Sequence, residues 1–538
     1  MIDVVLTNKT IDECLKEQAK NSPNSIAIEY EDELFTWNDL EVRADFVAIS
    51  LWKKGIRKGS HVGIWSVNSP NWIFTFLGLT KLGAIPVLLN TCYKEIEMAR
   101  VIERNDIEFL CYGDGYKDIS YDDILQEILP GTLLSHERCI AIGRSADGCW
   151  NGLKEYTPVT REEQENFLGS MAVISPDDTA AILFTSGTSK TPKGVMLSHH
   201  NLVNNALEIS ANMKWTNQDR MCIAVPMYHC FGVTASLLVA IHTGCTMHLL
   251  PYFRTTQVFE KIHKQRCTIL NGVPTMFLAI IHNEKRKMYD LTSIRTGIMA
   301  GSQVSSSEYL KICETLGMER LQTSFGQTES SPCITISEYH DSLEIKAQTA
   351  GRKMKNVSLR IFDRETSKEL PVGEIGEIQT RGYHVMKGYY GMPEETKEVL
   401  SEDGWLSTGD LGSLDEDGYL HVTGRRGEMI IRGGENISPA EIEECICGFP
   451  NIKNIKVIGI KAEVMQEEIA ACVVSADGKA IDEKALRAYV KGRLSDYKVP
   501  KYILQFMQLP LNSSGKVILN EMRLVAMDRI SELYGELA

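Results

Sequence analysis

A loop that follows an apolar run carries the residues best suited to hold phosphate. Residues 180–184 are apolar and lead into the segment 185–194, TSGTSKTPKG. Backbone N–H groups and hydroxyls in such a loop can surround phosphate oxygens, and lysine adds positive charge. The segment lacks the GxxxxGK[ST] spacing of a Walker A loop. Composition alone leaves a solvated turn as the alternative, because Gly, Ser and Pro are ordinary turn residues.

Three charged residues in other glycine-containing segments suit the same chemistry. Glu329 ends the segment SFGQTE, Asp410 lies within WLSTGDL, and Lys516 ends PLNSSGK. Carboxylate oxygens bind Mg²⁺, and lysine can neutralise charge that develops on a reacting phosphate. Taken singly, each has a simpler interpretation: an exposed carboxylate, a turn and a solvated surface lysine.

Composition excludes several classes of function. The chain has 538 residues and a formal net charge of −14, which disfavours a nucleic-acid-binding role. Its 14 cysteines form no CxxC pair, so we expect reduced thiols and a cytoplasmic protein. No signal peptide is apparent. The apolar stretches 72–89 and 233–250 contain charged, histidine or glycine residues, so we interpret each as a helix followed by a strand, not as a transmembrane segment.

Alternating strands and helices must position these residues. Strand signals at 25–30 and 33–36 suggest a hairpin, Thr36 and Asp39 suggest a capping box, and Gly55 and Gly83 suggest helix ends. Further strands are expected at 61–65 and 84–90, and the rhythm returns from 178 to 330. This alternation predicts an α/β fold with doubly wound, mainly parallel sheets.

The pattern changes twice beyond residue 350. Residues 350–424 carry more glycine turns and short strands, which suggests a small antiparallel β unit. The sequence GRRG at 424–427 then interrupts the chain, and about 110 residues with their own α/β pattern follow. We therefore expect a large N-terminal domain over 1–424, a hinge over 425–428 and a small α+β domain over 429–538.

The residues of these segments and their order along the chain resemble the core motifs of the adenylate-forming superfamily. This superfamily includes acyl-CoA synthetases, peptide-synthetase adenylation domains and firefly luciferase. Segment 185–194 resembles its phosphate loop, 226–232 (PMYHCFG) the segment that gates the acyl pocket, and 424–443 the hinge of a mobile C-terminal lid. Segment 295–302 (RTGIMAGS) is similar to the adenine-side loop of medium- and long-chain fatty acyl-CoA synthetases. The resemblance covers nearly the whole chain.

The resemblance assigns roles to single residues. It implies catalytic roles for Lys516, Glu329, Thr185 and His229, with Glu329 as the Mg²⁺ ligand. The residues implied to bind the nucleotide are Thr185, Ser186, Gly187, Thr188, Lys193, Gly301, Ser302, Gln303, Ser324, Phe325, Gly326, Gln327, Thr328, Asp410, Arg425 and Lys516. Asp410 would accept hydrogen bonds from the ribose hydroxyls, and Phe325 would stack on adenine.

Other residues are implied to contact the remaining substrates. The candidate acyl-pocket residues are His229, Val233, Gly272, Val273, Pro274, Gly301, Ser330 and Ser331. They are mostly small or apolar and include no aspartate for an amino group, which favours fatty, aryl or other amine-free acids. Gly433 and Gly434 would line the CoA channel, and Gly427 would be the hinge pivot.

Three positions depart from the family pattern. Lys190 replaces a usual glycine, Phe325 a more common tyrosine, and Gly427 a usual lysine or aspartate. The first affects the grip on triphosphate, and the second keeps stacking while losing a hydroxyl. The third gives a freer pivot, because glycine tolerates large changes of φ and ψ.

The implied reaction uses ATP, Mg²⁺ and coenzyme A. A carboxylate attacks the α-phosphorus of ATP, pyrophosphate leaves, and a thiol then attacks the carbonyl of the acyl-adenylate. The alternatives are an acyl-AMP ligase that loads a phosphopantetheine carrier protein, a non-catalytic nucleotide sensor and, more remotely, a luciferase-like oxidation. The sequence leaves open the acid, its chain length, the acceptor and whether the protein is a monomer or a homodimer.

Overall fold

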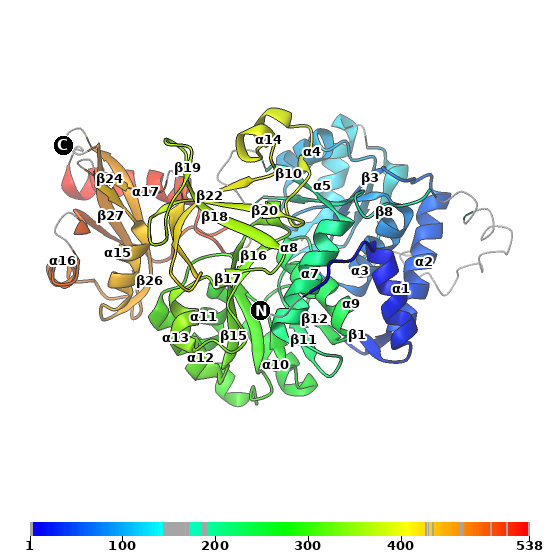
Figure 1. The fold of residues 1–538 in the computed structure, drawn as a ribbon, viewed down its shortest axis with the longest axis horizontal. Coiled ribbons are helices and arrows are strands. Elements are labelled where there is room, and N and C mark those ends of the chain that lie inside the picture. The colour runs from blue at the N-terminus through cyan, green and yellow to red at the C-terminus, as the bar shows by residue number, and fades with distance from the viewer. Residues whose placement is uncertain are drawn as a thin grey trace.

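The computed structural model describes residues 4–132, 134–143, 167, 172–185, 192–425, 428, 430–432, 435–462, 466–494, 498–512 and 515–535. Its elements form a large body and a smaller C-terminal one (Figure 1). The small body, at the left of the view, contains strands β24 (Ile430–Arg432), β26 (Ile452–Ala462) and β27 (Gln466–Ser475) and helices α15 (Pro439–Cys447), α16 (Glu483–Lys491) and α17 (Leu519–Tyr534). Helices α1 (Ile11–Asn21) and α2 (Trp37–Lys53) lie at the opposite end.

Two mainly parallel sheets form the core of the large body. Their central strands pair in parallel, whereas the edge pairs β1–β2, β15–β16, β16–β17, β9–β10 and β10–β21 are antiparallel. The first sheet has the order β17 (Arg352–Lys353), β16 (Cys333–Ile336), β15 (Arg320–Gly326), β14 (Thr296–Ala300), β13 (Ile269–Leu270), β11 (Arg220–Ile223), β12 (Thr246–Leu249), β1 (Ile26–Tyr30), β2 (Glu33–Thr36). The second has the order β21 (Gly388–Tyr389), β10 (Gly194–Ser198), β9 (Thr179–Phe184), β4 (Ile85–Leu88), β3 (His61–Trp65), β5 (Phe109–Tyr112), β8 (Cys139–Ala141). The predicted doubly wound fold is confirmed.

Helices cover these sheets and lie between them. The helices of the large body are α1, α2, α3 (Pro70–Leu82), α4 (Glu95–Arg104), α5 (Tyr121–Ile128), α7 (His199–Met213), α8 (Cys230–Gly232), α9 (Val239–Thr243), α10 (Thr255–Gln265), α11 (Pro274–His282), α12 (Ser306–Leu316), α13 (Leu343–Gln348) and α14 (Pro393–Val399). Helix α7 runs through the middle of the large body, and 12 of its residues are buried (Figure 1).

The third sheet is the predicted small β unit. Its order is β19 (Lys368–Glu369), β18 (Val357–Asp363), β20 (Gly376–Gly382), β22 (Leu406–Leu414), β23 (Leu420–Arg425), and all its pairs are antiparallel. Strand β23 ends at Arg425, and the sheet of the small body begins at Ile430.

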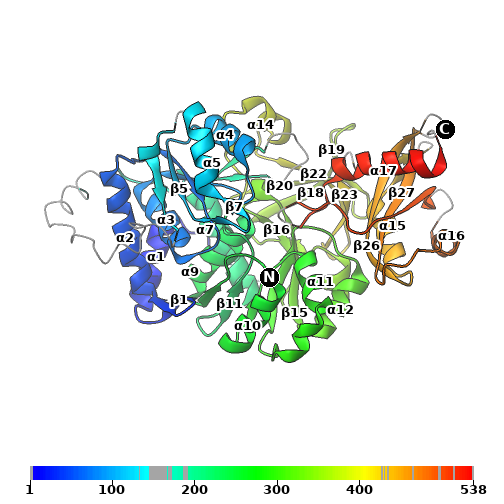
Figure 2. The same cartoon turned by 180° about the vertical axis from the view of Figure 1, so that it is seen from behind.

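The small body has its own sheet and hydrophobic core. Its strands are β25 (Glu435–Ile437), β24 (Ile430–Arg432), β27 (Gln466–Ser475), β26 (Ile452–Ala462) and β28 (Tyr502–Gln505), and its helices are α15 (Pro439–Cys447), α16 (Glu483–Lys491) and α17 (Leu519–Tyr534). Seen from behind, the segment that leads to α17 extends from the small body towards the large one (Figure 2).

Local predictions in the N-terminal part are largely confirmed. The hairpin β1–β2, the capping box of Thr36 with Asp39, and strand β3 form as expected. Two boundaries differ: the expected strand 84–90 is only Ile85–Leu88, and helix α2 ends at Lys53 with Lys54, not Gly55, as its C-cap. Gly55 follows in a turn at φ +95°. Both apolar stretches are a helix followed by a strand, and no helix in the described part of the chain is long and apolar enough to cross a membrane.

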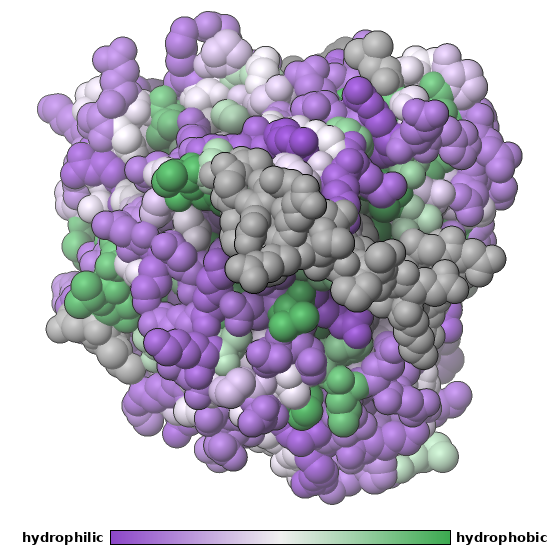
Figure 3. All heavy atoms as spheres, turned by 90° about the vertical axis from the view of Figure 1, so that its right-hand side faces the viewer, coloured by the Kyte–Doolittle hydropathy of each residue, from purple (hydrophilic) through white to green (hydrophobic). Residues whose placement is uncertain are grey.

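The surface beside α1 and α2 is mainly hydrophilic. In Figure 3, which faces this end of the molecule, hydrophobic residues among those described lie in small groups between larger hydrophilic areas. Scattered apolar side chains of this kind are normal on a protein surface and carry no functional conclusion.

Candidate active site

One cavity of about 530 Å³ lies where the two bodies meet. It brings together predicted residues from segments that are far apart in the sequence: Thr185, Lys193, His229, Gly301, Ser324, Gly326, Gln327, Thr328, Glu329, Arg425 and Lys516. Strands β14 and β15 are parallel neighbours in the first sheet, so their carboxyl ends lie at one edge of it, and Ala300 and Gly326 line the cavity there. Strand β9 belongs to the second sheet and ends next to Thr185, another lining residue.

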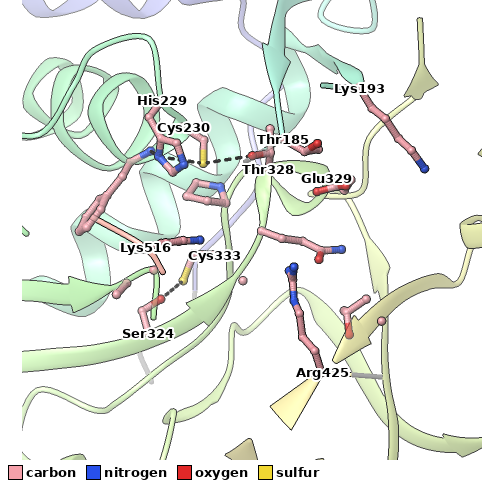
Figure 4. Close-up of a pocket in the computed structure, with 18 of the residues that line it drawn as sticks. Thr185, Lys193, His229, Cys230, Ser324, Thr328, Glu329, Cys333, Arg425 and Lys516 are labelled. Atoms are coloured by element: carbon pink, nitrogen blue, oxygen red, sulfur yellow. Dashed lines mark hydrogen bonds between the residues drawn. The ribbon is translucent and has the colours of Figure 1, made fainter. Parts of the chain in front are cut away.

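Lys516 enters the cavity from the small body. It stands on a tight turn in which the N–H of Asn512 donates to the carbonyl of Lys516 at 2.7 Å and the Lys516 N–H donates to Asn512 Oδ1 at 2.9 Å. Gly515 precedes it at φ +81°, and a Cβ there would lie 2.6 Å from Thr275 Oγ1 in the large body. Only glycine therefore suits this close approach. Lys516 and Arg425 point into the cavity from different sides (Figure 4).

The pKa of Lys516 is changed by its surroundings in the cavity. Burial, with a further contribution from the nearby charge of Arg425, lowers the pKa of the Lys516 ammonium group below its ordinary value. A bound anion would reverse this effect by favouring the charged form. The arrangement thus favours binding of a negatively charged group beside Lys516.

Glu329 is a partly buried carboxylate of the cavity lining. The Tyr389 hydroxyl donates a hydrogen bond to Glu329 Oε1 at 2.7 Å, and Lys193 Nζ lies 4.7 Å from the centre of the Tyr389 ring. Burial raises the pKa of Glu329, and the Tyr389 hydrogen bond opposes that rise. Glu329 is therefore held as a hydrogen-bonded acceptor, and its carboxylate oxygens are the kind of ligand that hard metal ions prefer.

Asp410 and Arg425 form an ion pair across neighbouring strands. They face each other in the β22–β23 pairing, and Arg425 Nε donates to Asp410 Oδ1 at 2.9 Å. Arg425 lines the cavity, whereas Asp410 is 7% exposed and lies behind it. Burial raises the pKa of Asp410, and Arg425 opposes the rise. The pair places a carboxylate and a guanidinium together at the end of the β unit.

His229 is held as a neutral ring. It caps α8, and the N–H of Phe231 donates to its Nδ1 at 3.2 Å, so the proton of the neutral imidazole resides on Nε2. Burial, with the nearby charge of Lys516, lowers the pKa of His229 to about 4. His229 can therefore donate a hydrogen bond from Nε2 at neutral pH but is not a cation.

Several predicted residues lie outside the cavity lining. Ser302 and Gln303 are exposed, and Gln303 Nε2 donates to the carbonyl of Val422 at 2.8 Å. Phe325 packs against the cores of the large body and of the β unit. Of the acyl-pocket candidates, His229 and Gly301 line the cavity; those that do not are Val233, Gly272, Val273, Pro274, Ser330 and Ser331. Val273 lies close behind, since a Cβ on Gly301 would be 3.1 Å from its Cγ1.

Seven predicted or singled-out residues lie outside the described part of the chain. They are Ser186, Gly187, Thr188, Lys190, Gly427, Gly433 and Gly434.

Sequence reasoning missed other lining residues. Tyr389 is the most consequential, because its hydroxyl contacts Glu329. The doubled aromatic after a glycine at 388–390 could have drawn attention to it. The apolar lining residues Ile209, Ala235, Pro332 and Leu519 gave no signal, since apolar residues in helices and strands are indistinguishable from ordinary core. Seven more lie within the predicted motif segments but were not predicted individually: Cys230, Phe231, Ile298, Ala300, Thr408, Gly409 and Glu428. Also missed were Cys333, Asn520 and Arg523.

No group of three or more His, Cys, Asp or Glu side chains among the described residues could hold a metal ion by itself. A divalent cation would have to share Glu329 with a ligand that brings its own oxygens. Mg²⁺ commonly binds in that way, through one or two carboxylates plus phosphate oxygens and water.

Comparisons with known proteins identify the family to which the two bodies are similar. The family model of AMP-binding enzymes matches residues 15–390, and that of the AMP-binding enzyme C-terminal domain matches residues 441–516. YngI of Bacillus subtilis (strain 168), described as a proposed acyl-CoA synthetase, is 38% identical over 95% of this chain and 96% of its own. The mitochondrial medium-chain acyl-CoA ligase ACSF2 of Rattus norvegicus is 34% identical over 96% of this chain and 87% of its own. The crystal structure of ATP-bound MatB from Rhodopseudomonas palustris has a TM-score of 0.83 at 29% identity, covering 97% of this chain and 100% of the other.

Proposed function

The chain belongs to the AMP-binding enzyme family, and on that premise we propose that the cavity activates a fatty carboxylic acid for transfer to a thiol. The protein is an AMP-forming acid–thiol ligase, an acyl-CoA synthetase that uses ATP, Mg²⁺ and coenzyme A. It converts the acid and ATP into acyl-AMP and pyrophosphate, then transfers the acyl group to the thiol of coenzyme A to give acyl-CoA.

The observation that carries the proposal is the meeting of Lys516 and Arg425 with Glu329 and His229 at one cavity. When a carboxylate attacks the α-phosphorus, negative charge grows on the phosphoryl oxygens and on the leaving pyrophosphate. Lys516, Lys193 and Arg425 would counter that charge, and the Nε2–H of His229 would donate a hydrogen bond to the substrate carboxylate. The contribution is electrostatic and positional, with no covalent enzyme intermediate.

Mg²⁺ fits beside Glu329. The donor is a carboxylate, a single one is typical when phosphates supply other ligands, and the Tyr389 hydroxyl orients it. The metal would neutralise charge on the triphosphate. The nucleotide roles of Thr185, Ser324, Gly326, Gln327, Thr328 and Asp410, and of the undescribed Ser186, Gly187 and Thr188, follow from the same proposal.

The second half-reaction requires the thiol to reach the acyl carbonyl. We propose that the domain of residues 429–538 turns about a hinge at 425–428, pivoting at Gly427, and withdraws Lys516. Among the described residues, the polar bonds between the two bodies include Ser306 N–H to Glu444 Oε1 at 3.2 Å and the Ser438 hydroxyl to the Thr423 carbonyl. Gly433 and Gly434 would then let the pantetheine arm approach the backbone.

The acid is proposed to be fatty. One part of the cavity lining is apolar and comes from Ile209, Phe231, Ala235, Ile298 and Pro332. Such a surface accommodates an alkyl chain. The match to a medium-chain acyl-CoA ligase supports the same class of acid.

The proposal also covers the acyl acceptor and the cellular location. Free coenzyme A is the proposed acceptor, and a phosphopantetheinylated carrier protein is the second candidate because the adenylation chemistry would be the same. A cytoplasmic location is proposed from the reduced cysteines; the 13 cysteines of the described residues are all free. The oligomeric state is left to measurement.

A panel assay tests the proposal. Pyrophosphate release is measured with ATP, Mg²⁺ and fatty acids of increasing chain length, alongside aryl, bile and amino acids. We expect release with fatty acids and acyl-CoA formation when coenzyme A is added. Absence of release with every acid would overturn the proposal, and acyl transfer only to a carrier protein would select the second acceptor.

A further inference from the structure

Helix α7 is unusual in being buried on nearly all sides while carrying many polar residues. Its buried polar side chains include Asn201, Asn204, Asn205, Glu208 and Asn212. Burial of an amide or carboxylate costs free energy unless the group is hydrogen-bonded. The hydrogen-bond partners of each of these side chains therefore show which segment of the protein it positions.

Asn205 holds both main-chain groups of one residue, Cys333. The N–H of Cys333 donates to Asn205 Oδ1 at 3.1 Å, and Asn205 Nδ2 donates to the carbonyl of Cys333 at 2.9 Å. Cys333 is the first residue of β16, and the pairing of β15 with β16 shifts register next to the Gly326–Cys333 pair. The side-chain amide supplies the partners that a regular strand neighbour would provide.

The segment held in this way is a wall of the active-site cavity. Cys333 and Pro332 line it, and so does Ile209, which lies one helical turn after Asn205 on α7. Cys333 Sγ also lies 3.3 Å from Ser324 Oγ, another lining atom (Figure 4). Helix α7 thus contributes one side chain to the apolar part of the cavity and fixes the backbone of another.

A second group of bonds fixes the orientation of Asn205 itself. Asn205 Nδ2 lies 3.4 Å from the Tyr383 hydroxyl, which donates to Glu208 Oε2 at 3.1 Å. Glu208 is fully buried, and its Oε1 accepts from the N–H of Asn356 at 3.0 Å. Because this chain of bonds ends on a buried carboxylate, the Asn205 amide is held by partners other than Cys333.

We propose that Asn205 is a positioning residue for acyl-chain recognition: by fixing the backbone at Cys333 it sets the place of the wall that the alkyl chain contacts. The inference rests on the proposed function, since it takes the occupant of the apolar part of the cavity to be the acyl chain. Asn205 does not touch the substrate. It determines the affinity for the acid and the longest acid that fits.

The first test is Asn205→Ala. Loss of both bonds to Cys333 lets the wall relax, so the KM for the preferred fatty acid rises about tenfold. The chain-length profile broadens towards longer acids, because the wall no longer stops the chain at one place. The KM for ATP and the kcat at saturating acid stay within about twofold of the wild-type values. Pyrophosphate release with a series of fatty acids gives the KM for the acid, the kcat and the chain-length profile, and the same assay at varied ATP gives the KM for ATP.

Asn204→Ala is the matched control. Asn204 is the neighbouring buried asparagine on α7, but its Oδ1 accepts from the N–H of Thr7 at 2.7 Å and its Nδ2 donates to the Thr7 carbonyl at 2.9 Å. This variant loses a comparable pair of bonds and lowers the unfolding temperature, while the KM for the acid and the chain-length profile stay unchanged. Equal kinetic effects of the two variants, or no effect of Asn205→Ala on the acid, would overturn the inference.

If Asn205→Ala fails to fold, a second variant tests whether this wall contacts the acyl chain. Cys333→Leu enlarges the wall residue directly, so the longest accepted acid becomes shorter while the KM for ATP is kept. An unchanged chain-length profile would show that this wall does not contact the acyl chain and would overturn the inference. A wild-type enzyme inactive with every acid would instead overturn the proposed function, and this inference with it.

Discussion

At the scale of single residues, Lys516 is the side chain whose removal should separate the two half-reactions. It is the lysine that the small body places in the cavity, and the second half-reaction is proposed to occur after it has withdrawn. We expect Lys516→Ala to slow adenylation by about 10²–10³-fold, as loss of one charge-stabilising contact typically does. Thioester formation from supplied acyl-adenylate should be largely kept.

Pyrophosphate release measures the first step, and acyl-CoA formation from synthetic acyl-AMP measures the second. Lys479→Ala is the control, because the Lys479 side chain is 82% exposed on the same body and pairs with Asp477 at 3.2 Å. Equal losses in both half-reactions of Lys516→Ala would contradict the assigned role.

Tyr389 provides a second prediction at this scale, and it concerns pH. Glu329 must be ionised to bind Mg²⁺, burial raises its pKa, and the Tyr389 hydroxyl opposes that rise. Tyr389→Phe removes the opposing hydrogen bond, so the pKa of Glu329 increases further. The low-pH limb of the kcat/KM profile should therefore move to higher pH, and more Mg²⁺ should be needed for half-maximal rate.

Tyr390→Phe is the matched control, since the Tyr390 hydroxyl donates to Asp106 at 2.7 Å outside the cavity lining. Its pH profile and Mg²⁺ requirement should equal those of the wild type. An unshifted acid limb in Tyr389→Phe would show that the hydroxyl does not tune Glu329.

At this scale four charged residues of the site could be predicted from the sequence, whereas several uncharged residues that line the cavity beside them could not. Lys193, Glu329, Arg425 and Lys516 were predicted because their segments resemble the motifs of the family, and all four line one cavity. Tyr389 and Cys333 were not predicted, since an aromatic residue or a cysteine in a strand has the same appearance whether it lines a cavity or fills a core.

At the scale of elements, the capping box that begins α2 can be tested separately from catalysis. The Asp39 N–H donates to Thr36 Oγ1 at 3.1 Å, and the Thr36 N–H donates to Asp39 Oδ2 at 2.8 Å. Thr36→Ala removes one half of this exchange, so the free energy of unfolding should fall by about 1 kcal/mol. Urea denaturation measures it.

Thr36→Ser retains the hydroxyl and should restore most of the loss. The KM values of both variants should equal those of the wild type, because Thr36 does not line the cavity. A kinetic defect in Thr36→Ala without a stability defect would contradict a purely structural role.

The sequence predicted helix α2 and the hairpin before it, but not the sheet to which the hairpin belongs. The helix signals of α2 and the hairpin β1–β2 were correct. However, β1 pairs with β12, more than 200 residues later, while β3 belongs to the other sheet. Neither periodicity nor turn residues carry that information, because strand pairing between distant segments depends on the packing of the whole core.

At the scale of the whole molecule, the two bodies and their order were predictable, because composition and strand pattern change near 350 and near 424. The place of their contact was not. Next to Lys516, Gly515 passes close to Thr275 on α11, so this contact joins residues 240 positions apart. Such an approach depends on the orientation of one domain relative to the other, which local sequence does not encode.

The stability of the whole fold should depend on buried neutral histidines. His199, which is 1% exposed, has its pKa lowered to about 4 by burial, with Asp178 opposing, and its Nδ1 accepts from the N–H of Ile11 at 3.2 Å. In the unfolded chain the ordinary pKa is about 6.5. Between these two values the unfolded state binds the additional proton, so acidification favours unfolding. The contribution of the neutral ring is complete above pH 6.5 and declines as the pH falls towards 4.

His199→Asn isolates this effect, because an asparagine Oδ1 can accept from Ile11 and does not titrate. Between pH 7.5 and pH 5 the wild type should lose about 2 kcal/mol of unfolding free energy relative to the variant, as the linkage of a pKa of about 4 with one of 6.5 requires. Buried carboxylates such as Glu208 shift stability equally in both proteins, so they cancel in the difference. Urea denaturation at several pH values measures it, and a difference that stays constant with pH would mean that His199 is not buried in its neutral form.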